Sequence, residues 1–470
     1  MKVTLISPKI GFNRYPQHPL GLGKISAVLE ENSHEVQLID ADALDLSSDE
    51  VITALHRFHP EIVGISARTP SIQSASYLAE KIRKNYSVPI VVGGPHSTTL
   101  PEKTLHEFSA FDVAVRHEGE YPMLDLAEGL PLKQIEGITY REDQKVISTP
   151  DRPLIEDLDK LPFSAYHLMP MKSYKVYPPN LPMPYVTMVS SRGCPYKCAY
   201  CYHGLFGHQY RFNSAEYVVN EIEHCIKNFG IKSVLFFDDV FNLNRKRTVD
   251  LCNLLIERKL KIKFGCESRV NTVDEELLRL MKEAGCIEVS YGVESGNQHI
   301  LNEWHKGITL QEIQRAFKLT DRVGIKTLLA YMIVGAPNET EETIKESMKF
   351  IEELNPDFCQ WSVACPLPST ELEKWFTSQF GMKLNDKDLM YLPSTGIIFA
   401  DWKPTYRTKN LTNDELWNWV KKATKHYYLR LRYLLRRLKK LNGWTEFKMD
   451  AIGLHDLLVS FTSRLKKTDS

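Results

Sequence analysis

Three closely spaced cysteines constrain this chain more than any other feature. None of its nine cysteines precedes residue 194, and three then fall within eight residues, at Cys194, Cys198 and Cys201. An odd number of cysteines with one tight group indicates metal binding in a reducing compartment rather than a disulfide framework. The group follows a β-branched run, so we expect a loop at the end of a strand that presents three thiols together.

Three thiolates on such a loop can wrap one face of a cuboidal iron–sulfur cluster. A [4Fe–4S] cluster has four irons and usually four thiolate ligands, so three thiolates leave one iron open to another ligand. The alternative is a zinc site in which His203 or His208 joins the three cysteines. Structural zinc sites usually combine two short pairs of ligands, so the spacing of the cysteines favours the cluster.

Short β-branched runs alternate with helical patterns from the start of the chain. This alternation predicts a doubly wound, Rossmann-like α/β domain over residues 1–140. The expected strands cover residues 3–7, 35–39, 62–66, 90–92 and 113–115, and the expected helices residues 21–31, 49–58 and 72–84. Ser47 and Glu50 are predicted to form a capping box at the second helix. Ligands of such domains bind at the carboxyl ends of the strands.

A second βα series predicts a partial, TIM-like (β/α)6 barrel over residues 185–395, after an irregular linker over 141–184. Its expected strands cover residues 185–190, 233–238, 263–268, 287–293, 327–333 and 358–364. Its expected helices cover residues 215–228, 245–258, 275–284, 310–322 and 341–352. Residues 396–470 are predicted to be helical and increasingly basic. Six βα units are fewer than the eight that close a full barrel.

The charge balance excludes some partners. Lys+Arg and Asp+Glu number 59 each, so we expect the chain as a whole to have no general attraction for nucleic acid or for an anionic membrane. No apolar run approaches the roughly 20 residues that span a bilayer, and the expected location is the cytoplasm. Lysines and arginines interleave with leucines and tyrosines over residues 421–441. This pattern predicts an amphipathic helix that either packs on the barrel or contacts a membrane surface or a lipid.

The cysteine loop resembles the signature of the radical S-adenosylmethionine (SAM) superfamily. The resemblance is carried by the Cys-x3-Cys-x2-Cys spacing and by the aromatic Tyr200 before the third cysteine. It implies a [4Fe–4S] cluster whose open iron binds the amino and carboxylate groups of SAM. It also implies reductive cleavage of SAM to methionine and a 5′-deoxyadenosyl radical. An external one-electron reductant such as flavodoxin or ferredoxin would supply the electron.

Later strand ends carry candidates for the other SAM contacts of that superfamily. The resemblance implies that carboxylates meet the SAM ammonium group, that Ser268 and Arg269 meet its carboxylate, and that a Gly-x-Glu-Ser element lies near the ribose. It also implies a turn against the adenine, where Asn338 replaces a glycine; asparagine tolerates the left-handed conformation expected there. The full set is Tyr200, Asp238, Asp239, Ser268, Arg269, Glu294 and Gly335. Taken singly, a strand-end aspartate can equally be a helix cap, and Arg269 can be a surface ion pair.

The first domain resembles the cobalamin-binding domains that are fused to radical SAM barrels. Short motifs at three strand ends carry this resemblance: Pro19-Leu20-Gly21-Leu22, Gly93-Gly94-Pro95-His96 and His117-Glu118-Gly119-Glu120. The implied cobalamin contacts are Leu20, Gly21, Ser66, Gly93, Gly94, His96, Glu118 and Gly119. No histidine has an aspartate two residues before it, so the usual Asp-x-His cobalt ligand is missing. His96 is therefore expected to touch the periphery of the ligand. The alternative is a domain that binds another ligand or none.

The combined resemblance implies a cobalamin-dependent radical SAM methyltransferase. Such an enzyme transfers a methyl group from methylcobalamin to an unactivated carbon of a small molecule, with lipids and natural products as candidate substrates. The alternative is an enzyme on the same scaffold that does not methylate, like the oxygen-independent ring cyclases. A tRNA methylthiotransferase would need cysteines in the first domain, which has none. A binding protein with a structural or sensory cluster is disfavoured by the open iron.

Overall fold

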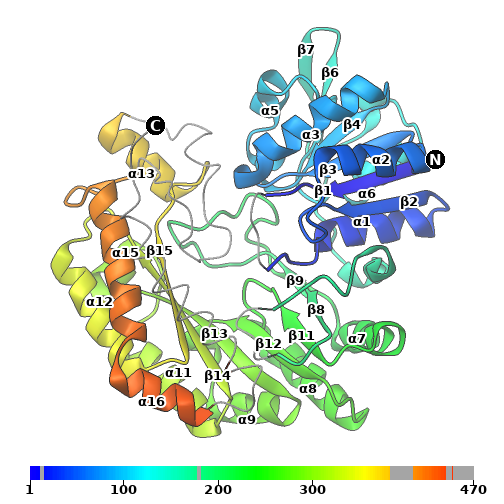
Figure 1. The fold of residues 1–470 in the computed structure, drawn as a ribbon. Helices are drawn as coiled ribbons and strands as arrows, with labels where there is room; N and C mark the ends of the chain where they lie inside the picture. Colours follow the sequence, from blue (N-terminus) through cyan, green and yellow to red (C-terminus); the bar gives the residue numbers. More distant parts are fainter. Residues whose placement is uncertain (11–14, 177–180, 382–405, 441–446, 448–470) are drawn as a thin grey trace.

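The computed structural model describes residues 1–10, 15–176, 181–381, 406–440 and 447. Two α/β units and a set of C-terminal helices make up the molecule (Figure 1). The first unit, coloured blue to cyan, lies over one end of the second, coloured green to yellow. None of the helices in the described residues is long and apolar enough to cross a membrane.

The first unit contains a sheet of seven strands in the order β2-β1-β3-β4-β5-β6-β7. Its first five strands are parallel, and β6 and β7 continue the sheet in antiparallel fashion. The strands are β1 (Lys2–Ser7), β2 (Glu35–Asp40), β3 (Ile62–Ser66), β4 (Ile90–Gly93), β5 (Val113–Val115), β6 (Ile138–Glu142) and β7 (Lys145–Ser148). The doubly wound fold is confirmed, because consecutive parallel strands are joined by crossover helices.

Helices cover both faces of this sheet (Figure 1). The helices are α1 (Leu20–Glu31), α2 (Ser48–Phe58), α3 (Ile72–Asn85), α4 (Pro95–Thr99), α5 (Pro101–Glu107) and α6 (Glu120–Ala127). On one face, Leu55 of α2 and Leu78 of α3 share a core with Ile6 and Ile65 of the strands. The predicted capping box is present at α2, where Ser47 and Glu50 exchange side-chain and backbone hydrogen bonds.

The region from 141 to 184 differs from the predicted irregular linker. Its first residues complete β6 and form β7. These two strands pair as a hairpin at the edge of the first sheet. Only β6 is well buried, and β7 has the burial of an edge strand. Such a half-exposed hairpin lacks the continuous apolar run by which the buried strands were predicted.

The second unit is a parallel sheet of six strands in the order β15-β14-β13-β12-β11-β8, as the six βα units predicted. The strands are β8 (Tyr185–Met188), β11 (Ser233–Phe236), β12 (Lys263–Ser268), β13 (Cys286–Glu294), β14 (Thr327–Val334) and β15 (Phe358–Val363). The helices between them are α7 (Ala215–Phe229), α8 (Arg245–Glu257), α9 (Glu275–Glu283), α10 (Gln298–Glu303), α11 (Leu310–Val323) and α12 (Glu341–Leu354). Figure 1 shows α7, α8, α9, α11 and α12 along the outer side of the curved sheet.

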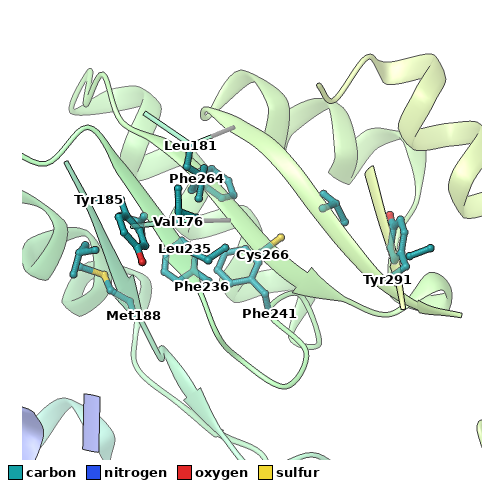
Figure 2. Close-up of a cluster of buried hydrophobic side chains, with 14 of the residues drawn as sticks. Val176, Leu181, Tyr185, Met188, Leu235, Phe236, Phe241, Phe264, Cys266 and Tyr291 are labelled. Carbon is teal, nitrogen blue, oxygen red and sulfur yellow. The ribbon is translucent and has the colours of Figure 1, made fainter. Parts of the chain in front are cut away.

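Aromatic side chains form part of the buried core of the second unit. The rings of Phe236 and Phe241 lie 4.6 Å apart, and Phe264 meets Phe236 edge-on at 5.9 Å. Figure 2 shows them in one buried cluster with Cys266. Cys266 is 1% exposed, which agrees with its predicted role as a small core residue.

In the described part of the chain, three helices follow β15: α13 (Glu371–Phe380), α15 (Asn413–Tyr428) and α16 (Leu431–Lys440). The sequence did not predict α13, which directly follows a turn at residues 368–370 and is capped by Thr370. The helical prediction for 396–470 holds where α15 and α16 are described. Residues 396–405, 441–446 and 448–470 lie outside the described part of the chain.

Candidate active site

The cysteine loop is closed at its base by two short strands. β9 (Ser191–Arg192) pairs antiparallel with β10 (Arg211–Phe212), so residues 193–210 project as one loop. Gly193 adopts φ 84°, and a Cβ there would lie 2.2 Å from the carbonyl oxygen of Gln209. Any other residue would therefore collide with the returning strand.

Two contacts hold the middle of the loop against the barrel. The N–H of Ala199 donates to the carbonyl of Trp304 at 3.0 Å, and the carbonyl of Ala199 accepts from the N–H of Leu372 at 2.9 Å. The loop is thus fixed from both sides, and its thiols remain accessible: Cys194 and Cys198 are partly exposed and Cys201 is exposed. All three are free.

The thiols lie close enough to affect one another's ionisation. Although the residue is exposed as a whole, protein atoms around the Cys201 thiol displace water from it and raise its pKa to about 12, and Asp239 and the thiolates of Cys198 and Cys194 act in the same direction. Burial likewise raises the pKa of Cys194. The thiols are therefore protonated while no metal is bound, and a metal or cluster that binds here displaces their protons.

The donor set fits a cuboidal cluster better than a single ion. Within the described residues, no three His, Cys, Asp or Glu side chains converge on a common metal centre. In a [4Fe–4S] cluster each thiolate binds a different iron, so a common centre is not required. His203 and His208 pack their rings together at 4.4 Å, and the Nδ1 of His208 lies 3.3 Å from the carbonyl oxygen of Cys194.

The carboxylate of Asp238 is engaged by hydrogen bonds within the protein. Its carboxylate accepts hydrogen bonds from the N–H of Ser190 at 3.2 Å, from the hydroxyl of Ser190 at 2.9 Å and from the hydroxyl of Ser191. The side chain is 1% exposed, and burial raises its pKa. It therefore fixes the turn from β8 to the cysteine loop. Asp239 is exposed, and its charge acts on the thiol of Cys201. It is therefore the better candidate for a SAM contact.

Arg269 has hydrogen-bonding capacity to spare. Its guanidinium lies 3.8 Å from the ring centroid of Tyr196 in the cysteine loop, and its Nε donates to Asn271 at 2.9 Å. Its Nη2 is buried and has no partner among the described residues. A buried guanidinium nitrogen without a partner beside the cysteine loop can donate a hydrogen bond to the carboxylate of a bound ligand. The hydroxyl of Ser268 is instead engaged with Asn242 at 2.7 Å.

Glu294 is held in a strained conformation by a buried ion pair. Its φ is 66°, and the register between β13 and β14 shifts at this point. The ammonium of Lys306 lies 2.7 Å from its carboxylate and 3.2 Å from the hydroxyl of Tyr200. The sequence predicted Glu294 and Tyr200 but missed Lys306, which joins them. Its position in a turn after α10 carries no pattern that distinguishes it from a surface lysine.

The Gly335 turn is built around a buried carboxyl group. Gly335 has φ 109°, and its N–H and that of Ala336 donate to Glu339 at 3.1 and 3.3 Å. Burial raises the pKa of Glu339 to about 7. The prediction of a left-handed conformation for Asn338 is wrong, since its φ is not positive. Its side chain donates instead to Glu303 at 2.5 Å.

A cavity of about 400 Å³ lies at the carboxyl ends of the parallel strands in the first unit. Seven of the eight predicted cobalamin contacts line it: Leu20, Gly21, Ser66, Gly93, Gly94, Glu118 and Gly119. Gly94 has φ 108°, and a Cβ there would lie 2.8 Å from the carbonyl oxygen of Ala67. His96 is not among the lining residues. It is 1% exposed, with its Nδ1 3.4 Å from the hydroxyl of Thr69, so it supports the loop from behind.

The sequence missed His18, Arg68, Arg192 and Phe206, which also line the cavity. Both ring nitrogens of His18 are buried without a partner among the described residues, and burial lowers its pKa to about 3. A neutral imidazole with two free nitrogens suits a polar ligand in this cavity. The available signal was its place directly before the Pro19-Leu20-Gly21 motif.

A buried ionic network connects this cavity to the cysteine loop. Arg192, two residues before Cys194, lies 2.6 Å from the carboxylate of Glu118 and 2.6 Å from that of Glu120. Arg211 of β10 lies 2.9 Å from Glu118. All four side chains are at least nine-tenths buried. The strand pair below the cluster loop is thus bound to the β5–α6 loop that lines the cavity.

Comparison with known proteins agrees with this division of the chain. The model of the B12 binding domain matches residues 13–127, and that of the radical SAM superfamily matches residues 188–351. An uncharacterized methyltransferase of Pyrococcus horikoshii is 35% identical over 433 residues, which are 91% of each chain. The chain belongs to the cobalamin-binding radical SAM enzymes. Its cofactors are therefore a [4Fe–4S] cluster, SAM and cobalamin.

Two further relatives of this radical SAM enzyme differ in the reaction that their names give. The anaerobic magnesium-protoporphyrin IX monomethyl ester cyclase of Rubrivivax gelatinosus is 34% identical over 72% of this chain and 62% of its own length. The methyltransferase TsrM of Kitasatospora setae, solved with cobalamin and a [4Fe–4S] cluster, is 19% identical with a TM-score of 0.69, over 91% of this chain and 88% of its own. The TsrM likeness confirms the fold: an α/β cobalamin domain, a partial barrel and C-terminal helices.

Proposed function

We propose that this radical SAM enzyme is a methyltransferase that moves a methyl group from methylcobalamin to an unactivated carbon of a small molecule. The observation that carries the proposal is the shared wall of the two cofactor regions. Arg192 of β9, at the base of the cysteine loop, and Leu205 and Phe206 within the loop also line the first-domain cavity. A substrate between the two would meet both cofactors, as methyl transfer requires.

Each group of residues would have a defined task. Cys194, Cys198 and Cys201 would hold the cluster, and Asp239, Arg269 and Glu294 would orient SAM at the open iron. The cavity residues of the first unit would hold cobalamin. When bound, these cofactors supply the radical and the methyl group, so the protein's work is positioning. An external one-electron donor, for which flavodoxin and ferredoxin are candidates, would reduce the cluster.

The similarity to the Pyrococcus methyltransferase over 91% of each chain supports methylation. The similarity to the Rubrivivax cyclase supports a second candidate, an oxidative ring closure without methyl transfer. The two reactions differ in what becomes of SAM. Methylation consumes SAM as a methyl donor and as a radical source, so it releases both S-adenosylhomocysteine and 5′-deoxyadenosine. The cyclisation releases only 5′-deoxyadenosine.

The test uses enzyme reconstituted anaerobically with iron, sulfide and cobalamin, then incubated with SAM, a reductant and candidate substrates. We expect both SAM-derived products in the same reaction mixture. The Cys198→Ala variant is expected to lose 5′-deoxyadenosine formation. The matched control is Cys225→Ala, a buried cysteine in α7 that should retain it. Formation of 5′-deoxyadenosine alone, with an oxidised and unmethylated product, would refute methyl transfer.

A further inference from the structure

Helix α16 exposes one continuous face that the proposed reaction does not use. Leu431, Leu435 and Leu438 are 72%, 52% and 59% exposed, and Arg432 and Lys439 are also exposed. At about 100° per residue, the three leucines fall within an arc of about 60°, and the two bases lie along one side of it. The exposed face is thus a leucine stripe edged with positive charge.

The opposite side of α16 is anchored, so the direction of this face is fixed. Tyr433 is 6% exposed and donates to the carbonyl of Asp357 at 3.1 Å. The side chains of Arg436 and Lys440 form ion pairs with the carboxylate of Asp357 at 3.2 and 2.8 Å. The helix therefore cannot turn its leucines inward without breaking these buried contacts.

The location of α16 keeps its exposed face away from the cofactors. Asp357 precedes β15, and Lys326, whose carbonyl accepts from Lys440 at 3.4 Å, precedes β14. The helix is thus bound at the amino ends of the barrel strands, whereas the cluster loop and the Gly335 turn lie at the carboxyl ends. Figure 1 shows α16 on the side of the molecule remote from the first unit. A large flat partner on α16 would leave the site accessible.

The charge of α16 indicates which kind of partner its exposed face would bind. Five of the ten residues of α16 are basic and none is acidic: Arg432, Arg436, Arg437, Lys439 and Lys440. Arg432 and Lys439 form no ion pair with a described acidic side chain. We propose that α16 docks on the surface of an anionic lipid bilayer. The leucines would enter the boundary of the acyl chains while the bases meet head-group phosphates. A nucleic acid would suit the arginine and lysine side chains but would offer no apolar surface to the leucines.

The test is co-sedimentation of the full-length, reconstituted enzyme with lipid vesicles. We expect binding to vesicles that contain phosphatidylglycerol, with weaker binding to pure phosphatidylcholine and at high salt. Replacing Leu431, Leu435 and Leu438 together by serine should reduce partitioning at least about tenfold. The double variant Arg432→Gln, Lys439→Gln should lose the preference for the anionic vesicles.

The matched control replaces Leu44 and Tyr77 by serine, which are exposed apolar side chains of the first unit (44% and 55%). This control should bind vesicles like the parent enzyme, and all variants should retain their cluster because the substituted side chains are exposed. No binding to either vesicle, or equal binding by the leucine variant, would overturn the proposal. Concentration-dependent self-association that the leucine variant abolishes would also overturn it, and would assign the face to a second copy of the chain.

Discussion

At the scale of single residues, the side chains of the site are held by partners that are distant in the sequence. Lys306 satisfies Glu294 and reaches Tyr200, which lies 106 residues away in the cysteine loop. Spacing predicted the three cysteines, and the resemblance to the radical SAM superfamily implied Tyr200 and Glu294. Neither could predict Lys306 or the buried nitrogen of Arg269, because these roles arise from contacts between separate strands. His96 was placed in the cavity from its motif, but the neighbouring Gly94 and Pro95 form the wall there.

The Lys306→Met variant should be strongly destabilised. It leaves the buried carboxylate of Glu294 without a counter-charge, and such a loss costs about 3–5 kcal/mol of the free energy of unfolding. Denaturant unfolding of the protein would measure this. In the control, Lys246→Met, an exposed helical ion pair with Asp250 is removed, and the expected loss is below about 1 kcal/mol. Equal losses in the two variants would contradict the buried pairing.

The buried Glu339 predicts a pH effect on stability. Its pKa is raised from an ordinary value of 4.5 to about 7, because burial disfavours the carboxylate. Between these values the folded state binds the proton and the unfolded state releases it, so the contribution of Glu339 to stability falls as pH rises through this window. The Glu339→Gln variant should lose about 3 kcal/mol of that pH dependence. Unfolding free energies of both proteins from pH 4.5 to above pH 7 would show it, and parallel curves would refute it.

At the scale of elements, the buried parallel strands were predictable and the edge elements were not. β3 and β5 match their predicted bounds because each is a short, continuously buried run between turns. The β6–β7 hairpin was missed because its outer strand is half-exposed, and α13 was missed because it begins directly at a proline-rich turn. The junction between the cysteine loop and the first unit was also out of reach, since Arg192 and Glu118 are 74 residues apart.

This junction predicts a coupling between the two cofactor regions. The Arg192→Met variant removes the counter-charge of Glu120 and one of the two that serve Glu118, so it should cost about 3 kcal/mol of stability. It should also weaken cobalamin binding, which is measurable by absorbance titration of the purified protein. The control is Arg245→Met, whose ion pair with Glu276 is exposed. Unchanged cobalamin affinity in the Arg192 variant would show that the junction does not shape the cavity.

At the scale of the whole molecule, the chain places two cofactor-binding units so that one loop belongs to both. The residues 193–210 carry the thiols and, through Leu205 and Phe206, complete the wall of the first-domain cavity. The order of the domains was predictable from the sequence, because each unit repeats its own βα pattern. Their contact was not, since it depends on buried charges that look like surface residues in the sequence.

The proposed reaction depends on three thiolates that hold a [4Fe–4S] cluster with one iron open to SAM. The most direct test is electron paramagnetic resonance of the reduced, anaerobically reconstituted enzyme, with and without SAM. We expect the signal of a reduced [4Fe–4S] cluster whose g values shift when SAM is added, because SAM becomes a ligand of the open iron. A signal that SAM leaves unchanged, or a protein that binds zinc in place of the cluster, would contradict the account.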